Sequence, residues 1–170
     1  EAPMLYIGEK VGSGLGDGVD IALDPLEGTA ITSKGMPNSL SVIAAAKRGC
    51  MLHSPDTYMQ KIAIGKGYSN DVIDLDASVA DNIKSLANAK KVNKKDITAC
   101  VLERDRHIDI IESLRSIGSK IFFIPDGDVA GVMMTSQEDI DVDIYFGTGG
   151  APEGVLAAAA LQCIGGQIQT

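Results

Sequence analysis

The chain after Asp76 alternates between segments with helical periodicity and short apolar segments, and this alternation limits the fold more than any other feature. Apolar residues that recur every three to four positions predict helices, and the short apolar runs between them predict strands. The expected helices begin at Ser78, near Arg106, near Val129 and at Pro152, and the expected strands cover residues 97–102, 120–124 and 142–146. Such an alternation is typical of an α/β unit with a largely parallel sheet.

Start and stop residues support these helices. Ser78 can cap the amide near Asp81, and Val79, Ile83 and Leu86 then share one apolar face. Glycines at positions 118 and 165 are suitable helix stops.

The first 75 residues have a different character. Three short apolar or alternating runs, 19–24, 41–46 and 58–64, are separated by clusters of Gly, Pro, Asn and Ser. This pattern predicts strands of a mixed sheet. We therefore expect a layered α/β fold with a mixed-sheet part (1–75) and an alternating α/β part (76–170) that together form one compact unit.

Composition excludes several classes of protein. Of the 170 residues, 45% are hydrophobic and 22% are charged, which is enough apolar material for a core. The net charge of −8, without a long basic run, argues against a nucleic acid partner. No segment approaches the roughly 20 apolar residues of a membrane helix, so we expect no membrane partner and a cytoplasmic location.

Ligands of parallel sheets bind beyond the carboxyl ends of the strands, so the loops that follow Leu102, Ile124 and Phe146 are the expected sites of chemistry. In the first of these loops, Arg104 and Arg106 either bind a phosphate or simply begin a mixed-charge helix. The second loop contains the acidic turn 125–128, which on its own is more typical of an Asx-type turn that caps the next helix than of a binding site.

The glycine-rich segment 147–154 lies between a strand and a helix, and amides at a helix start favour an anion. Glu153, in the first helical turn, is either a metal ligand or a complement to the helix dipole.

A second acidic turn directly follows the first predicted strand. In the segment Asp24-Pro25-Leu26-Glu27-Gly28-Thr29, two carboxylates and a hydroxyl can converge because Pro25 restricts the backbone and Gly28 permits a tight reversal. Oxygen ligands of this kind suit a hard divalent cation. The alternative is an ordinary turn with solvated acids.

Other features carry less functional information. The glycine-rich segment 12–18 lacks the dinucleotide-binding spacing, and no phosphate-binding P-loop motif is present. The three cysteines are interpreted as small buried apolar residues. His53 and His107 are isolated from one another, which favours surface or structural roles.

Several segments together resemble the class II fructose-1,6-bisphosphatases of the GlpX type, within the lithium-sensitive sugar and inositol phosphatase superfamily. The matching segments are 1–12, 19–29, 41–49, 125–130 and 149–155. The resemblance implies a layered sugar-phosphatase fold. It also implies hydrolysis of the 1-phosphate of fructose 1,6-bisphosphate with Mn²⁺ or Mg²⁺, in gluconeogenesis or carbon fixation.

The resemblance also implies roles for individual residues. Asp24, Glu27 and Glu153 would be metal ligands. Thr29 would position or activate the attacking water, acting with Asp24 and Glu27 as the catalytic group. The residues that would line the substrate pocket are Glu27, Gly28, Thr29, Tyr58, Arg104, Asp105, Arg106, Asp126, Gly127, Asp128 and Gly150.

Members of this family have a further upstream segment with an Asp and a Glu of the metal site, and a C-terminal extension. We therefore expect this chain to be a central fragment with weak or no activity alone, and to self-associate as a homo-oligomer through exposed edges. The alternatives are a phosphatase for sedoheptulose 1,7-bisphosphate or an inositol phosphate, or a noncatalytic sugar-phosphate-binding module.

Overall fold

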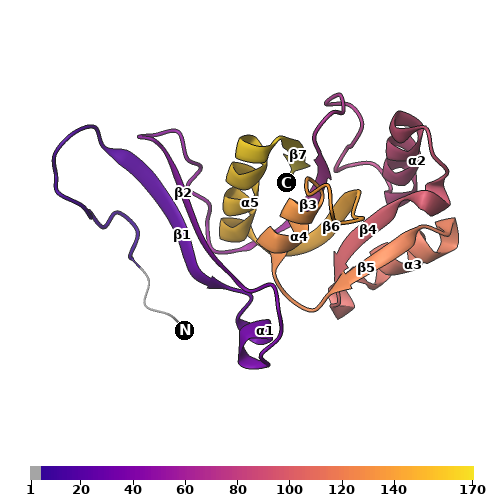
Figure 1. Cartoon of the computed structure of the whole chain (residues 1–170), viewed down its shortest axis with the longest axis horizontal. Coiled ribbons are helices and arrows are strands. Elements are labelled where there is room, and N and C mark those ends of the chain that lie inside the picture. The colour runs from indigo at the N-terminus through magenta and orange to yellow at the C-terminus, as the bar shows by residue number, and fades with distance from the viewer. Residues whose placement is uncertain (1–4) are drawn as a thin grey trace.

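The computed structural model of the chain describes residues 5–170, which form four successive layers (Figure 1). The start of the matching segment 1–12 lies outside the described residues. Helices α2 (Val79–Lys90) and α3 (Ile108–Ile117) cover one face of a five-stranded sheet. Helices α4 (Asp128–Met134) and α5 (Ala151–Ile164) cover the other face, and a two-stranded ribbon packs outside α5. This arrangement confirms the expected layered α/β class.

The five-stranded sheet has the order β5-β4-β6-β3-β7. Its strands are β3 (Tyr58–Gly65), β4 (Thr98–Leu102), β5 (Lys120–Ile124), β6 (Ile144–Gly150) and β7 (Gly166–Gln169). Strand β4 pairs in parallel with both β5 and β6, as expected for the second half of the chain.

The sheet differs from the expectation in two details. Strand β3, from the first half of the chain, lies antiparallel between β6 and β7, and its last five residues are all buried. Strand β7 has only four residues and no apolar run, so the sequence pattern did not predict it.

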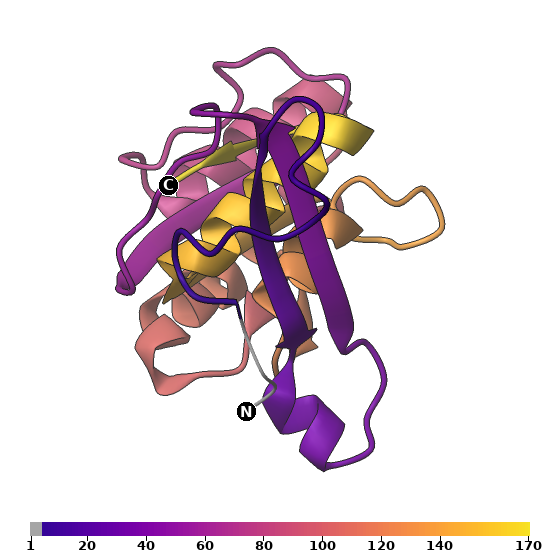
Figure 2. The same ribbon diagram turned by 90° about the vertical axis from the view of Figure 1, so that its left-hand side faces the viewer.

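The ribbon contains β1 (Val19–Glu27) and β2 (Leu40–Lys47), joined through the short helix α1 (Thr29–Ser33). The strands are antiparallel, and their register shifts between Asp24 and Glu27. Figure 2 shows the ribbon lying in front of α5. Its outer face exposes Val19, Ile21 and Ile43.

The core consists of two clusters, one on each face of the five-stranded sheet. Because successive strand residues point to opposite faces, Ile62 and Ile64 of β3 belong to one cluster and Ala63 to the other. Cys100 is buried as expected, but the expectation was wrong for Cys50 and Cys163, which are exposed at the turn after β2 and near the end of α5.

Local signals explain where the helices begin and end. The Ser78 hydroxyl accepts a hydrogen bond from the Asp81 amide at 3.1 Å, as predicted, and Gly118 ends α3 with a left-handed φ of 80°. Short 3₁₀ helices, η1 (Lys94–Asp96) and η2 (Asp105–His107), precede β4 and α3. Across residues 5–170, no helix is long and apolar enough to cross a bilayer.

The cap on α2 provides a test of the fold. Ser78→Ala should lower the free energy of unfolding by about 1 kcal/mol, because the Asp81 amide loses its side-chain partner. Urea denaturation followed by circular dichroism measures this change. Ser116→Ala, on the exposed surface of α3, is the control and should stay within about 0.5 kcal/mol of wild type. An equal effect of both substitutions would contradict the capping role.

Candidate active site

The carboxyl ends of β4, β5 and β6 meet at one edge of the sheet, as the parallel register requires. From β4 the chain passes through α3 to β5, and from β5 it returns through α4 to β6 on the other side of β4. The strand order therefore reverses between β4 and β6. Ligands of open α/β sheets bind in the crevice outside such a reversal point.

Glu27 ties the ribbon to this edge. Its Oε1 accepts the Val129 amide of α4 at 3.1 Å, and in return Asp126 Oδ2 accepts the Ala30 amide of α1 at 3.0 Å. Two acidic segments that are about a hundred residues apart in the sequence thus bind each other's helix. Neither carboxylate caps its own helix, so the simple capping interpretation of the turn 125–128 was wrong. The expectation of a turn directly after residue 24 was wrong, because β1 continues to Glu27 through an irregularity in its pairing with β2.

The second carboxylate oxygen of Glu27, Oε2, is buried without a hydrogen bond among the described residues. The whole residue is only 4% exposed. The pKa of Glu27 is raised to about 7, mainly by burial and with smaller contributions from the charges of Asp128, Asp126 and Asp24, whereas the Val129 hydrogen bond opposes the shift. An unpaired buried carboxylate oxygen is costly unless a donor or a cation satisfies it.

Asp128 lies beside Glu27 in a buried network. Lys61 Nζ on β3 is 2.5 Å from Asp128 Oδ2, and the Tyr145 hydroxyl on β6 donates to Oδ1 at 2.9 Å. Burial and the neighbouring Asp128 raise the pKa of Tyr145, so this hydroxyl remains a donor. A side chain at Gly149 would collide with the Asp128 carboxylate, which explains why this position lacks one. Asp128 is therefore held rigidly at the start of α4.

Two arginines follow β4 at the same edge. Arg104 Nη2 is 3.2 Å from Asp126 Oδ1, and Arg106 Nε donates to the Thr148 carbonyl at 2.6 Å. The Arg106 guanidinium also lies 5.1 Å from the centre of the Tyr58 ring. Both positive charges thus sit at the reversal point, where guanidinium groups can bind a phosphate.

The structure does not gather the three expected metal ligands into one group. Within residues 5–170, no three His, Cys, Asp or Glu side chains lie close enough together to hold a metal ion. Asp24 Oδ1 accepts the Leu26 amide of its own strand at 3.0 Å, and the Glu153 carboxylate lies against Gly150. The unpaired oxygen of Glu27, with Asp24 near enough to affect its pKa, nevertheless fits a hard divalent cation.

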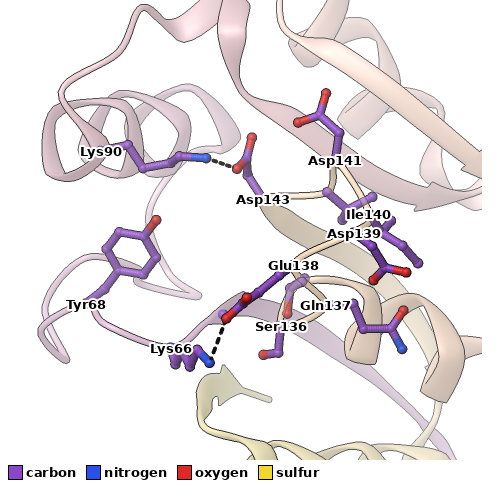
Figure 3. Close-up of a pocket in the computed structure, with 13 residues that line it drawn as sticks. Lys66, Tyr68, Lys90, Ser136, Gln137, Glu138, Asp139, Ile140, Asp141 and Asp143 are labelled. Atoms are coloured by element: carbon purple, nitrogen blue, oxygen red, sulfur yellow. Dashed lines mark hydrogen bonds and ion pairs between the residues drawn. The ribbon is translucent and has the colours of Figure 1, made fainter.

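A cavity of about 460 Å³ lies at the opposite edge of the sheet, where β3 ends and β6 begins (Figure 3). Four carboxylates and two lysines line it, and Lys66 and Lys90 pair with Glu138 and Asp143. Both lysines of the cavity are engaged in ion pairs, and the cavity lies away from the carboxyl ends of β4, β5 and β6, so we place the candidate site at the arginine edge.

Comparison with known proteins identifies the family of the chain. The family model for bacterial, glpX-encoded fructose-1,6-bisphosphatases matches residues 1–170. The chain belongs to this family.

Individual relatives within the family are also close in sequence. The chain is 46% identical over 168 residues to the class 2 fructose-1,6-bisphosphatase 1 of Escherichia coli K12, and 45% identical over 169 residues to the class 2 enzyme of Haemophilus influenzae Rd. Each match covers 99% of this chain and 50% of the relative. The chain thus spans about half the length of the curated relatives it matches.

In this member of the bisphosphatase family, the predicted substrate residues come from several distant segments. Tyr58 pairs with Gly150 across β3 and β6, and Thr29 is exposed at the start of α1. Gly28 and Gly127 precede α1 and α4 with φ values of 85° and 97°, which side chains other than glycine rarely adopt. Asp105 is exposed in η2. The roles of these residues in binding stay predictions.

Sequence reasoning missed Lys61 and Tyr145. A lone lysine within the apolar run of β3 was the available signal, because a buried lysine needs an acidic partner. Nothing local points to Tyr145. The interpretation of the histidines is confirmed, since His53 is exposed and His107 is buried within hydrogen bonds to the backbone.

Removal of the Tyr145 hydroxyl tests the Asp128 network. Tyr145→Phe should lower the free energy of unfolding by about 1–3 kcal/mol, because Asp128 Oδ1 then loses a buried donor. Tyr58→Phe is the matched control, since the Tyr58 side chain is exposed, and it should change stability by less than about 0.5 kcal/mol. Chemical denaturation measures the free energy of unfolding of wild type and both variants. A change in Tyr145→Phe as small as that in Tyr58→Phe would contradict the proposed network.

The pKa of Glu27 predicts a pH dependence of stability when EDTA removes divalent cations. The folded chain retains the Glu27 proton up to about pH 7, whereas the unfolded chain releases it near the ordinary value of 4.5. The free energy of unfolding should therefore fall as the pH rises through this window, by at most about 3 kcal/mol from this group. Glu27→Gln should remove that slope, and Glu112→Gln, exposed on α3, should keep it. Equal slopes in both variants would refute the assignment to Glu27.

Proposed function

We propose that this chain takes part in the metal-dependent hydrolysis of the 1-phosphate of fructose 1,6-bisphosphate, which yields fructose 6-phosphate and inorganic phosphate. Membership of the family supports the reaction class. The observation that carries the proposal is the buried Oε2 of Glu27, which has no hydrogen-bond partner within residues 5–170 and lies beside an edge with two arginines. This combination suits a phosphate ester together with a divalent cation.

Asp24, Glu27 and Glu153 would hold Mn²⁺ or Mg²⁺. Such a cation, when bound, neutralises the charge that develops on the transferred phosphoryl group. The present separation of these side chains implies that Asp24 and Glu153 reorient when the site fills.

The remaining roles belong to the side chains around the edge. The Thr29 hydroxyl, exposed at the start of α1, orients the attacking water. Arg104 and Arg106 bind the second phosphate through charge-assisted hydrogen bonds. The carboxylates of Asp126 and Asp128 have further lone pairs and accept hydrogen bonds from sugar hydroxyls.

The identity of the sugar is a separate part of this proposal. Fructose 1,6-bisphosphate is proposed over sedoheptulose 1,7-bisphosphate and inositol phosphates on the names of the relatives alone. A cytoplasmic location and self-association likewise stay predictions.

Release of inorganic phosphate by the purified chain tests the proposal. Turnover of fructose 1,6-bisphosphate with Mn²⁺ or Mg²⁺ should stop with EDTA and fall at least about 100-fold in Glu27→Gln, because the variant loses a charged ligand. Glu112→Gln should retain the wild-type rate.

A panel with sedoheptulose 1,7-bisphosphate and inositol phosphates identifies the preferred sugar. Turnover that resists EDTA, or that survives in Glu27→Gln, would exclude the proposed chemistry. If a folded wild-type chain released no phosphate under any of these conditions, the chain would not carry the activity by itself.

A further inference from the structure

His107 is a buried histidine at the end of η2, directly beside the candidate site. Its Nδ1 lies 2.8 Å from the Leu102 carbonyl oxygen, and the Thr148 amide donates to its Nε2 at 2.8 Å. A backbone N–H only donates and a carbonyl only accepts. The ring must therefore be neutral, with its proton on Nδ1.

These two backbone groups belong to neighbouring parallel strands whose pairing has just ended. The last pair of the β4–β6 ladder is Val101 with Phe146. The Glu103 amide bonds to Ile124 of β5, so by alternation the Leu102 carbonyl points toward β6. One more step of the ladder would bond the Thr148 amide directly to the Leu102 carbonyl. The imidazole stands between these two groups and replaces that bond.

The position of this ring is significant because β4 and β6 flank the reversal point of the sheet. An inserted imidazole holds the two strand ends apart at the place where a ligand crevice is expected. It does so without leaving either backbone group unpaired, which would be costly in a buried site. The imidazole thus acts as a spacer between β4 and β6.

The same turn also holds the other side of Thr148. Arg106, the residue before His107, donates from Nε to the Thr148 carbonyl at 2.6 Å. The backbone of Thr148 is therefore held by adjacent residues, His107 at its amide and Arg106 at its carbonyl. Displacement of Thr148 would remove the acceptor that orients the Arg106 guanidinium over Tyr58.

We propose that His107 is a positioning residue whose neutral imidazole spaces β4 from β6 and, through Thr148, fixes Arg106 where a phosphate group of the substrate binds. The identity of that ligand rests on the proposed function. The placement of the ring and of the guanidinium does not, because it follows from contacts within the chain.

Nuclear magnetic resonance of the ¹⁵N-labelled chain tests the spacer without any substrate. Long-range ¹H–¹⁵N spectra should show His107 as the neutral Nδ1–H tautomer near pH 7. In His107→Gln, the Arg106 Nε–H should exchange with solvent at least about tenfold faster than in wild type, because Thr148 is displaced. His53→Gln, an exposed histidine of the same chain, should leave that exchange unchanged.

Either an Nε2–H tautomer in wild type or unchanged Arg106 exchange in His107→Gln would overturn the proposal. If His107→Gln fails to fold, His107→Asn replaces it, because its amide can still donate to the Leu102 carbonyl but is too short to reach Thr148. The tautomer measurement needs no variant and remains decisive in either case.

Kinetics separate positioning from a purely structural role. In His107→Gln, KM for fructose 1,6-bisphosphate should rise about tenfold while kcat stays within about threefold, as expected for lost binding of a distal phosphate. A purely structural histidine would instead lower kcat through a smaller active fraction and leave KM unchanged, which would refute the positioning role. If the wild-type chain shows no turnover, it does not carry the activity by itself, and the tautomer and exchange results alone decide on the spacer.

Discussion

The hydrogen bond from the Val129 amide to Glu27 is the contact on which the arrangement of the candidate site depends. It joins the end of β1 to the start of α4, and helix α4 has no side-chain cap of its own. Burial of Glu27 in this position leaves its second oxygen without a partner in the described part of the chain and raises its pKa to about 7. The same residue thus assembles the site and destabilises it, a combination typical of functional positions.

The candidate edge of the sheet combines positive and negative groups. A net charge of −8 repels a bisphosphate at long range, yet Arg104, Arg106 and the buried Lys61 place positive charge among the carboxylates of this edge. Lys61 offsets Asp128 inside the protein, so the arginines are not needed to neutralise it. Local charge at a crevice, rather than net charge, governs binding of a small anion at short range.

The fold was predictable wherever a signal lies within a short segment. The helices at Ser78 and Pro152 and the parallel strands follow from periodicity and end residues, whereas the place of β3 in the sheet depends on pairing with strands far along the chain. The same limit applies to the site. Lys61 and Asp128 are 67 residues apart, and His107 and Thr148 are 41 apart, so no local pattern could join them.

The β1–β2 ribbon affects how the protein unfolds. A two-stranded sheet alone is only marginally stable in water. This ribbon packs against α5 on one face, and its outer face is exposed. It nevertheless contains both Asp24 and Glu27. Two of the three proposed metal ligands therefore lie in the part of the chain that is least able to form a cooperative folding unit by itself. Local unfolding of the ribbon would separate the site residues while the five-stranded sheet stayed folded. Loss of activity would therefore detect detachment of the ribbon from α5 earlier than the global melting temperature does.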